Sequence, residues 1–157
     1  MSAVYTDILN AVQWSIQQIG LKLADSTTLP NGQVYLRKLP TDRGGLTLPC
    51  VIVSESPDPE TDLGGTNARD DWGHPVLVTT VVASNQDVAV YDWEILWRQQ
   101  IRRKFHNQLL SGSGGLLATV YICVVEPRTI VDPSLFRDGN LSLGQLLVRA
   151  KSREVRT

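Results

Sequence analysis

The chain has 157 residues and a formal net charge of −1 at pH 7, with 20% charged and 42% hydrophobic residues. This length predicts a single domain, residues 1–157, with a substantial core. The charge balance argues against a dedicated nucleic-acid-binding protein but allows a local basic patch. Cys50 and Cys123 lie in apolar runs, which predicts buried thiols, with one bridge between neighbouring strands as the alternative. No signal-like or bilayer-spanning run is present, which predicts synthesis in the cytosol and no membrane partner.

Apolar residues recur at helical spacing from the N-terminus, which predicts a helix over residues 2–23. The stripe that defines it contains Val4, Ile8, Val12, Ile16, Ile19 and Leu23. Trp14 falls off this stripe, so it is either an ordinary surface side chain or a contact between subunits.

Three strands are predicted in the first half of the chain. Residues 33–38 alternate as an edge strand does, and residues 50–54 form a short apolar strand. Residues 76–83 are dense in β-branched side chains and apolar on both faces, which is typical of a central strand.

The segment from Ser56 to His74 separates two of these strands and predicts a long loop. Loops of this length are usually functional or disordered. Its charged and aromatic residues are Asp58, Glu60, Asp62, Arg69, Asp70, Asp71 and Trp72. One interpretation is a solvated, flexible loop. Another is an arm that orders on a partner, with Trp72 as the anchor. A metal site is disfavoured because the calcium-loop spacing is absent.

A second helix is predicted over residues 88–110, and its second half is basic. Arg98, Arg102 and Arg103 lie near one another on its polar face. They form either a solvated face or a patch for phosphate or an acidic partner. A glycine-rich loop at 111–115 and a strand at 118–126 follow. After a connector at 127–139, the last strand, 141–153, carries Arg149, Lys151 and Arg153 on one face, unless it is a frayed basic tail.

These elements predict an α+β fold, with a mixed, mostly antiparallel sheet of four to five strands packed with two main helices. No reactive motif stands out. His74 and His106 lack zinc-site spacing, and no Gly-x-Ser-x-Gly elbow occurs. We therefore expect no enzyme activity, no catalytic residues, no metal and no cofactor.

The order of elements resembles the tail-terminator proteins of long-tailed bacteriophages, and more broadly the tail-completion and head–tail joining proteins. The resemblance covers most of the chain. It is carried by the runs LPCVIVSE, RDDW at 69–72, PVLVTTVVAS and YDWEILWRQQIRRKF, followed by a final pair of strands.

The resemblance implies a virion protein that forms a six-membered ring on the last ring of the tail tube. Such a ring ends tube polymerisation and offers a surface to the head connector. DNA passes through the lumen without sequence-specific contact. In that setting the acidic loop, with Trp14, is expected to form a contact with the tube or with the neighbouring subunit. It could meet Arg98, Arg102 or Arg103 of the next subunit, because a ring requires two complementary faces. The basic C-terminal strand is longer than in the shortest family members, which leaves its role open.

Two other readings remain. One is another neck component, such as a head-closure or adaptor protein. The other is a nucleic-acid-binding module that would use the two basic groups, although aromatic stacking residues are not interleaved with those arginines.

Overall fold

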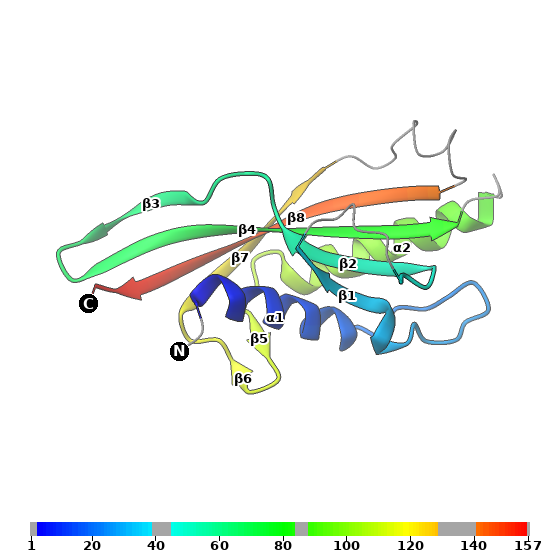
Figure 1. The fold of residues 1–157 in the computed structure, drawn as a ribbon, viewed down its shortest axis with the longest axis horizontal. Coiled ribbons are helices and arrows are strands. Elements are labelled where there is room, and N and C mark those ends of the chain that lie inside the picture. Colours follow the sequence, from blue (N-terminus) through cyan, green and yellow to red (C-terminus); the bar gives the residue numbers. More distant parts are fainter. Residues whose placement is uncertain (1–2, 39–44, 84–87, 129–140, 157) are drawn as a thin grey trace.

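The computed structural model describes residues 3–38, 45–83, 88–128 and 141–156 (Figure 1). In chain order the elements are α1 (Val4–Gln17), a short 3-10 helix (Asn31–Gln33), β1 (Val34–Arg37), β2 (Cys50–Glu55), β3 (Thr61–Thr66), β4 (Arg69–Ala83), α2 (Val88–Phe105), β5 (Ser111–Gly112), β6 (Gly115–Leu116), β7 (Val120–Pro127) and β8 (Leu141–Val155). The predicted α+β class is confirmed.

Within the described residues, the main sheet has six strands in the order β1-β2-β4-β8-β7, and β3 pairs with one end of β4. β1 runs parallel to β2, and the other pairs are antiparallel. The predicted central strand is confirmed, since β4 lies between β2 and β8. The sheet exceeds the predicted four to five strands because β3 lies inside the segment predicted as a loop.

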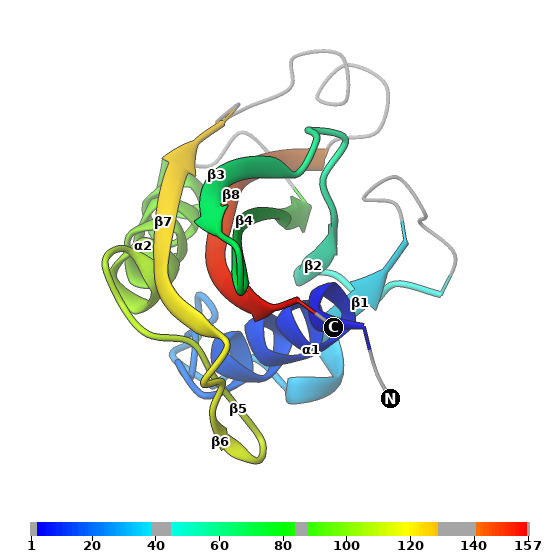
Figure 2. The ribbon, with the colours of Figure 1, turned by 90° about the vertical axis from the view of Figure 1, so that its left-hand side faces the viewer.

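Both helices pack on one face of the sheet. Their apolar side chains join those of alternate strand residues in the main core, which includes Ile8, Val12, Trp97, Ile101, Phe105, Val51, Val53, Val76, Val78, Leu146 and Val148. The view along the long axis shows the sheet curving, with α2 beside β7 and α1 beside β1 (Figure 2). A smaller apolar cluster around Cys50, Ile52 and Val81 lies on the other face, so β4 is buried on both sides.

The first helix is shorter than predicted. It ends at Gln17, and Gly20 adopts a positive φ of 68°, a conformation that glycine takes without a Cβ clash. The chain then turns back through a bridge between Lys22 and Thr28. Ile19 and Leu23 still pack against the main core beyond the end of the helix, which explains why the apolar pattern continued past it.

Most other strand boundaries lie within two residues of the predictions, except that β4 begins at Arg69 rather than at Val76. Two further corrections concern α2 and the segment that follows it. α2 ends at Phe105 rather than at residue 110, and the predicted glycine-rich loop forms the small β5–β6 hairpin. Most of the predicted connector at 127–139 lies outside the described residues. Both cysteines are buried and free, as predicted, and burial raises the pKa of Cys50 to about 11 and that of Cys123 to about 12.

Candidate functional site

The most distinctive feature is a β-arm that projects beyond both helices (Figure 1). We define the β-arm as β3 together with residues 69–73 of β4 and 151–155 of β8. The register pairs Thr61 with Gly73 on one side of β4 and Arg69 with Val155 on the other. The prediction of a long loop over 56–74 is therefore wrong. Only the connection before β3 and the turn at 67–68 lack strand structure in that segment.

Glycines allow the β-arm to fold. Gly64 has a φ of 100° beside a bulge in β3, and its N–H donates to Asp62 Oδ1 over 2.8 Å. At Gly65, an added Cβ would lie 2.5 Å from the carbonyl oxygen of Arg69. The two glycines that suggested a flexible loop thus serve a bulged strand.

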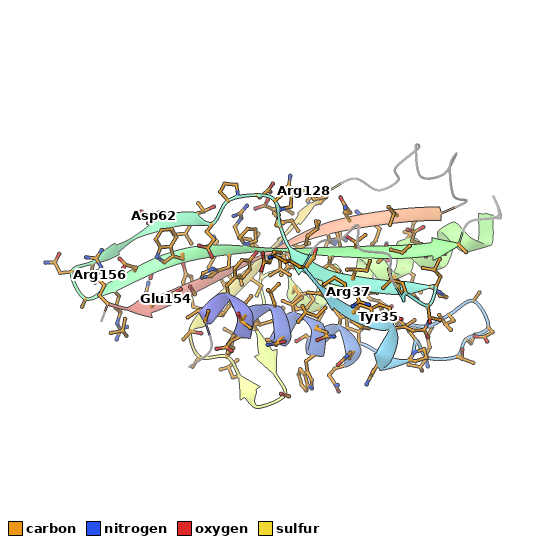
Figure 3. The ribbon with its side chains drawn as sticks, in the orientation of Figure 1. Tyr35, Arg37, Asp62, Arg128, Glu154 and Arg156 are labelled. Atoms are coloured by element: carbon orange, nitrogen blue, oxygen red, sulfur yellow. The ribbon has the colours of Figure 1, made fainter. Side chains whose placement is uncertain are left out.

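Two ion pairs neutralise the acidic residues near the tip of the β-arm. Asp71 accepts two hydrogen bonds of 2.8 Å from Arg153, and Asp70 accepts a bond of 2.6 Å from Arg156. The guanidinium hydrogen bonds hold the pKa of each carboxyl below its ordinary value. Asp62 and Glu154 lie on this arm, and Arg156 directly follows its last strand (Figure 3).

These two ion pairs weaken the case for the predicted contact between the acidic segment and the arginines of α2 in a neighbouring copy. Because Asp70 and Asp71 already have partners within the chain, they would gain little from Arg102 or Arg103 of a neighbour. Asp58 is likewise paired, with Arg128. The acidic character of the segment is thus largely balanced within the molecule.

His74 forms the root of the β-arm. Its Nδ1 lies 2.8 Å from Glu60 Oε1, and its Nε2 lies 2.9 Å from Ser152 Oγ and 3.1 Å from Glu154 Oε1. Both ring nitrogens therefore face carboxylates, an arrangement in which both donate only when the ring is protonated. The Tyr5 ring of α1 lies 5.5 Å away, and its hydroxyl donates to the carbonyl oxygen of residue 75. Burial raises the pKa of Tyr5.

The Ser152–His74–Glu60 sequence of bonds has the connectivity of a nucleophile–base–acid triad. Ser152 is fully buried, however, with none of its surface exposed, and its hydroxyl also bonds Glu154 over 3.0 Å. A nucleophile must reach its substrate. We therefore assign these residues to holding the β-arm on α1 and β8.

Arg149 also acts at the root of the β-arm. It donates to Glu126 Oε1 over 3.0 Å and to Thr61 Oγ1 over 2.8 Å. The predicted basic row of β8 does lie on one face, because Arg149, Lys151 and Arg153 oppose alternate residues of β4. Two of its three cations are engaged with carboxylates, so the row is not a free basic surface.

The predicted patch on α2 is divided by the structure. Arg98 is half-buried, donates to the carbonyl oxygen of Gln145 over 3.0 Å, and has a pKa lowered by burial. It lies beside Glu94, which is 4% exposed and bonds Ser142 over 2.7 Å; burial raises the pKa of Glu94. Only Arg102 and Arg103 of the predicted patch remain exposed, followed by Lys104.

Trp14 is half-buried in a groove of about 590 Å³ between α1 and the β5–β6 hairpin. Trp72 lies on the β-arm, opposite Ser152, and is also half-buried. Both tryptophans were predicted as contact residues, but the groove was not predicted, because the β5–β6 hairpin was expected to be a flexible loop.

Several residues of the β-arm were not predicted. His74 was considered only as a zinc ligand, and Ser152, Glu154 and Arg156 were not selected at all. Their roles depend on pairing between segments about 80 residues apart, such as the contact between His74 and Glu154. The alternation of charged residues in 149–156 was the available signal for such a ladder.

Within the described residues, no group of three His, Cys, Asp or Glu side chains is arranged to hold a metal ion. Neither described helix combines the length and apolarity needed to cross a membrane. No protein-family model matches the sequence, and no curated protein matches it either.

Proposed function

We propose that this protein is a structural virion subunit of the tail-terminator type. It forms a ring of about six copies that ends polymerisation of the tail tube and joins the tail to the head connector. DNA crosses the lumen of this ring without sequence-specific contact. The order of helices and strands along the chain, which resembles that of tail-terminator proteins, supports this proposal.

The β-arm is the observation that best supports this proposal. Two strands of 15 residues each, β4 and β8, continue from the core into the arm, so the projection is built from the main sheet. Asp70 and Asp71 are paired with arginines of the same chain, and all six residues of β3 are exposed. An ordered projection with an exposed strand suits assembly into a larger structure better than it suits small-molecule chemistry.

The nucleic-acid-binding alternative is less favoured by the side-chain contacts. Three of the six cations selected from the sequence, Arg98, Arg149 and Arg153, already bond carboxylates or backbone carbonyls. Affinity for phosphates grows with the number of cations that can reach them. Arg102 and Arg103 remain exposed, which is compatible with a surface near passing DNA.

Deletion of the gene from the phage genome that encodes this chain tests the proposal. A missing terminator leaves tube growth unchecked, so electron micrographs of lysates should show tails longer than normal and not joined to heads. Tails of normal length beside separate heads would instead identify a head-closure or adaptor protein. Normal virions in the deletion strain would contradict both readings.

The purified protein provides a second test. Light scattering across a concentration series, followed by electron microscopy, should detect a species of about six times the 17.4 kDa chain, with a central hole. A strict monomer in the presence of purified tail tubes, with no binding to their ends, would contradict the proposal.

A further inference from the structure

The groove beside α1 is lined by one stripe of the helix. Asp7, Asn10, Trp14 and Gln17 are spaced by three or four residues, so they share a face, and residues 112–117 form the opposite wall. At Gly112 an added Cβ would lie 3.4 Å from Cβ of Ala11, so the β5–β6 hairpin packs closely on the helix. The groove is therefore framed by ordered elements.

The groove is rich in hydrogen-bond acceptors. Among the described residues, the Asp7 carboxylate has neither a salt bridge nor a side-chain hydrogen bond. The amide nitrogens of Gln13 and Gln17 donate to backbone carbonyl oxygens, which leaves their amide oxygens available. Trp14 adds an aromatic ring. A carboxylate beside an aromatic face is an environment that suits a guanidinium group.

The tip of the β-arm carries a guanidinium group of this kind. Arg69 is exposed at the start of β4, and in the described part of the chain it forms no salt bridge. Its neighbours Asp70 and Asp71 are bound by Arg156 and Arg153. Arg69 and Asp7 thus carry opposite charges on two different surfaces, and among the described residues neither has a salt-bridge partner, although the Arg69 charge helps to lower the pKa of Asp71.

The outer edges of the main sheet differ in how far hydrogen bonds from other parts of the chain cover them. The outer edge of β7 is closed by bonds between Cys123 and residues 107 and 108, and by the bond from the Val125 N–H to His106. The edge of β1 is bonded at Val34 by Gln13. For the described residues, no other element bonds the outer edge of β3; the Gly64 N–H donates to Asp62 within the strand, and the other N–H groups on this edge can still donate.

We infer that the tip of the β-arm of one copy docks in the α1 groove of a second copy, with Arg69 facing Asp7. The partner is a second copy because the arm carries an exposed cation without a salt bridge and open backbone donors, while the groove carries side-chain acceptors without a donor among the described residues. One arm and one groove per chain make a heterologous interface, which repeats around a closed ring. This inference rests on the proposed ring and names its subunit contact.

Disulfide trapping between two variants, each with one added cysteine, tests the contact directly. Ala68→Cys lies in the turn of the β-arm, and Asn10→Cys lies in the groove; both positions are exposed. The native thiols are buried, with raised pKa values, so they should stay unreactive. An oxidised mixture of the two variants should contain a heterodimer. The matched control replaces Asn10→Cys with Arg102→Cys on α2.

A heterodimer yield for the groove pair no greater than that of the control would overturn the inference. Charge reversal supplies a second readout. Asp7→Lys and Arg69→Glu should each weaken self-association by about tenfold, and the double variant should recover most of the loss. Rings that persist unchanged in both single variants would refute this contact and leave the tail-terminator function standing. Normal virions after gene deletion would instead refute the function.

Discussion

Replacing Gly144 with alanine should destabilise the protein by crowding the contact between β8 and α2. An alanine Cβ at this position would lie 2.8 Å from Thr80 Oγ1, 3.0 Å from Arg98 Nη1 and 3.3 Å from Glu94 Oε1. Thr80 is 2% exposed, and its β-branched side chain has few alternative rotamers. The short contact therefore cannot be relieved by a simple rotation.

The magnitude follows from two effects. Crowding a packed interior costs about 1–3 kcal/mol. If Thr80 moves, it also loses its bonds to Glu94 and to the carbonyl oxygen of Gly144, which adds about 1 kcal/mol. We therefore expect Gly144→Ala to lower the free energy of unfolding by about 2–4 kcal/mol.

Urea denaturation followed by circular dichroism measures this loss. Gly114→Ala is the matched control, because an added Cβ there meets nothing within 4 Å and its backbone φ is not positive. The control should change stability by less than about 0.5 kcal/mol. A background substitution, Thr80→Ala, should reduce the cost of Gly144→Ala. Equal stabilities of the Gly144→Ala and Gly114→Ala variants would refute the reasoning.

Three further predictions concern buried and arm residues. Burial raises the folded-state pKa of Glu94 above its unfolded value, so its contribution to stability is full below about pH 4.5 and is lost as pH rises. The stability of the wild type relative to Glu94→Gln should therefore fall from acid to neutral pH, and a rise would contradict this. Cys50 and Cys123 should react with a thiol reagent only upon unfolding; fast labelling of the native protein would show that they are accessible. His74→Phe should accelerate amide hydrogen exchange in β3 but not in β2. Equal exchange rates in β3 of the wild type and of His74→Phe would show that His74 does not hold the β-arm in place.

The sequence predicted elements that bury one or both faces and missed those that bury neither. β4 and β2 were recognised because their side chains are apolar, and α2 was recognised by its stripe of apolar side chains. β3 is exposed along its whole length, so no alternation of apolar and polar residues marks it. Gly64 and Gly65 were taken as signs of a loop, although in β3 they serve a bulge and a close approach of two strands.

The site residues divide in a similar way. Spacing on α2 predicted a polar position for Arg98, but the sheet beneath that face offers the carbonyl oxygen of Gln145, which withdraws the side chain from solvent. The partners of Asp70 and Asp71 lie in β8, and a single sequence cannot show which distant residues meet. Trp14 was placed correctly off the apolar stripe, yet its groove depends on the β5–β6 hairpin.

The pairing of β4 with β8 imposes an order on synthesis. Asp70 and its partner Arg156 are 86 residues apart in the chain. Within the β-arm, β4 is hydrogen-bonded to β8 along residues 69–73. A nascent chain that has released β4 but not β8 from the ribosome therefore has only the exposed β3 to pair with this part of β4. Contacts of such long range form late and slowly. The arm is consequently completed only after β8 emerges, so the part of the molecule that projects furthest from the helices is among the last to fold.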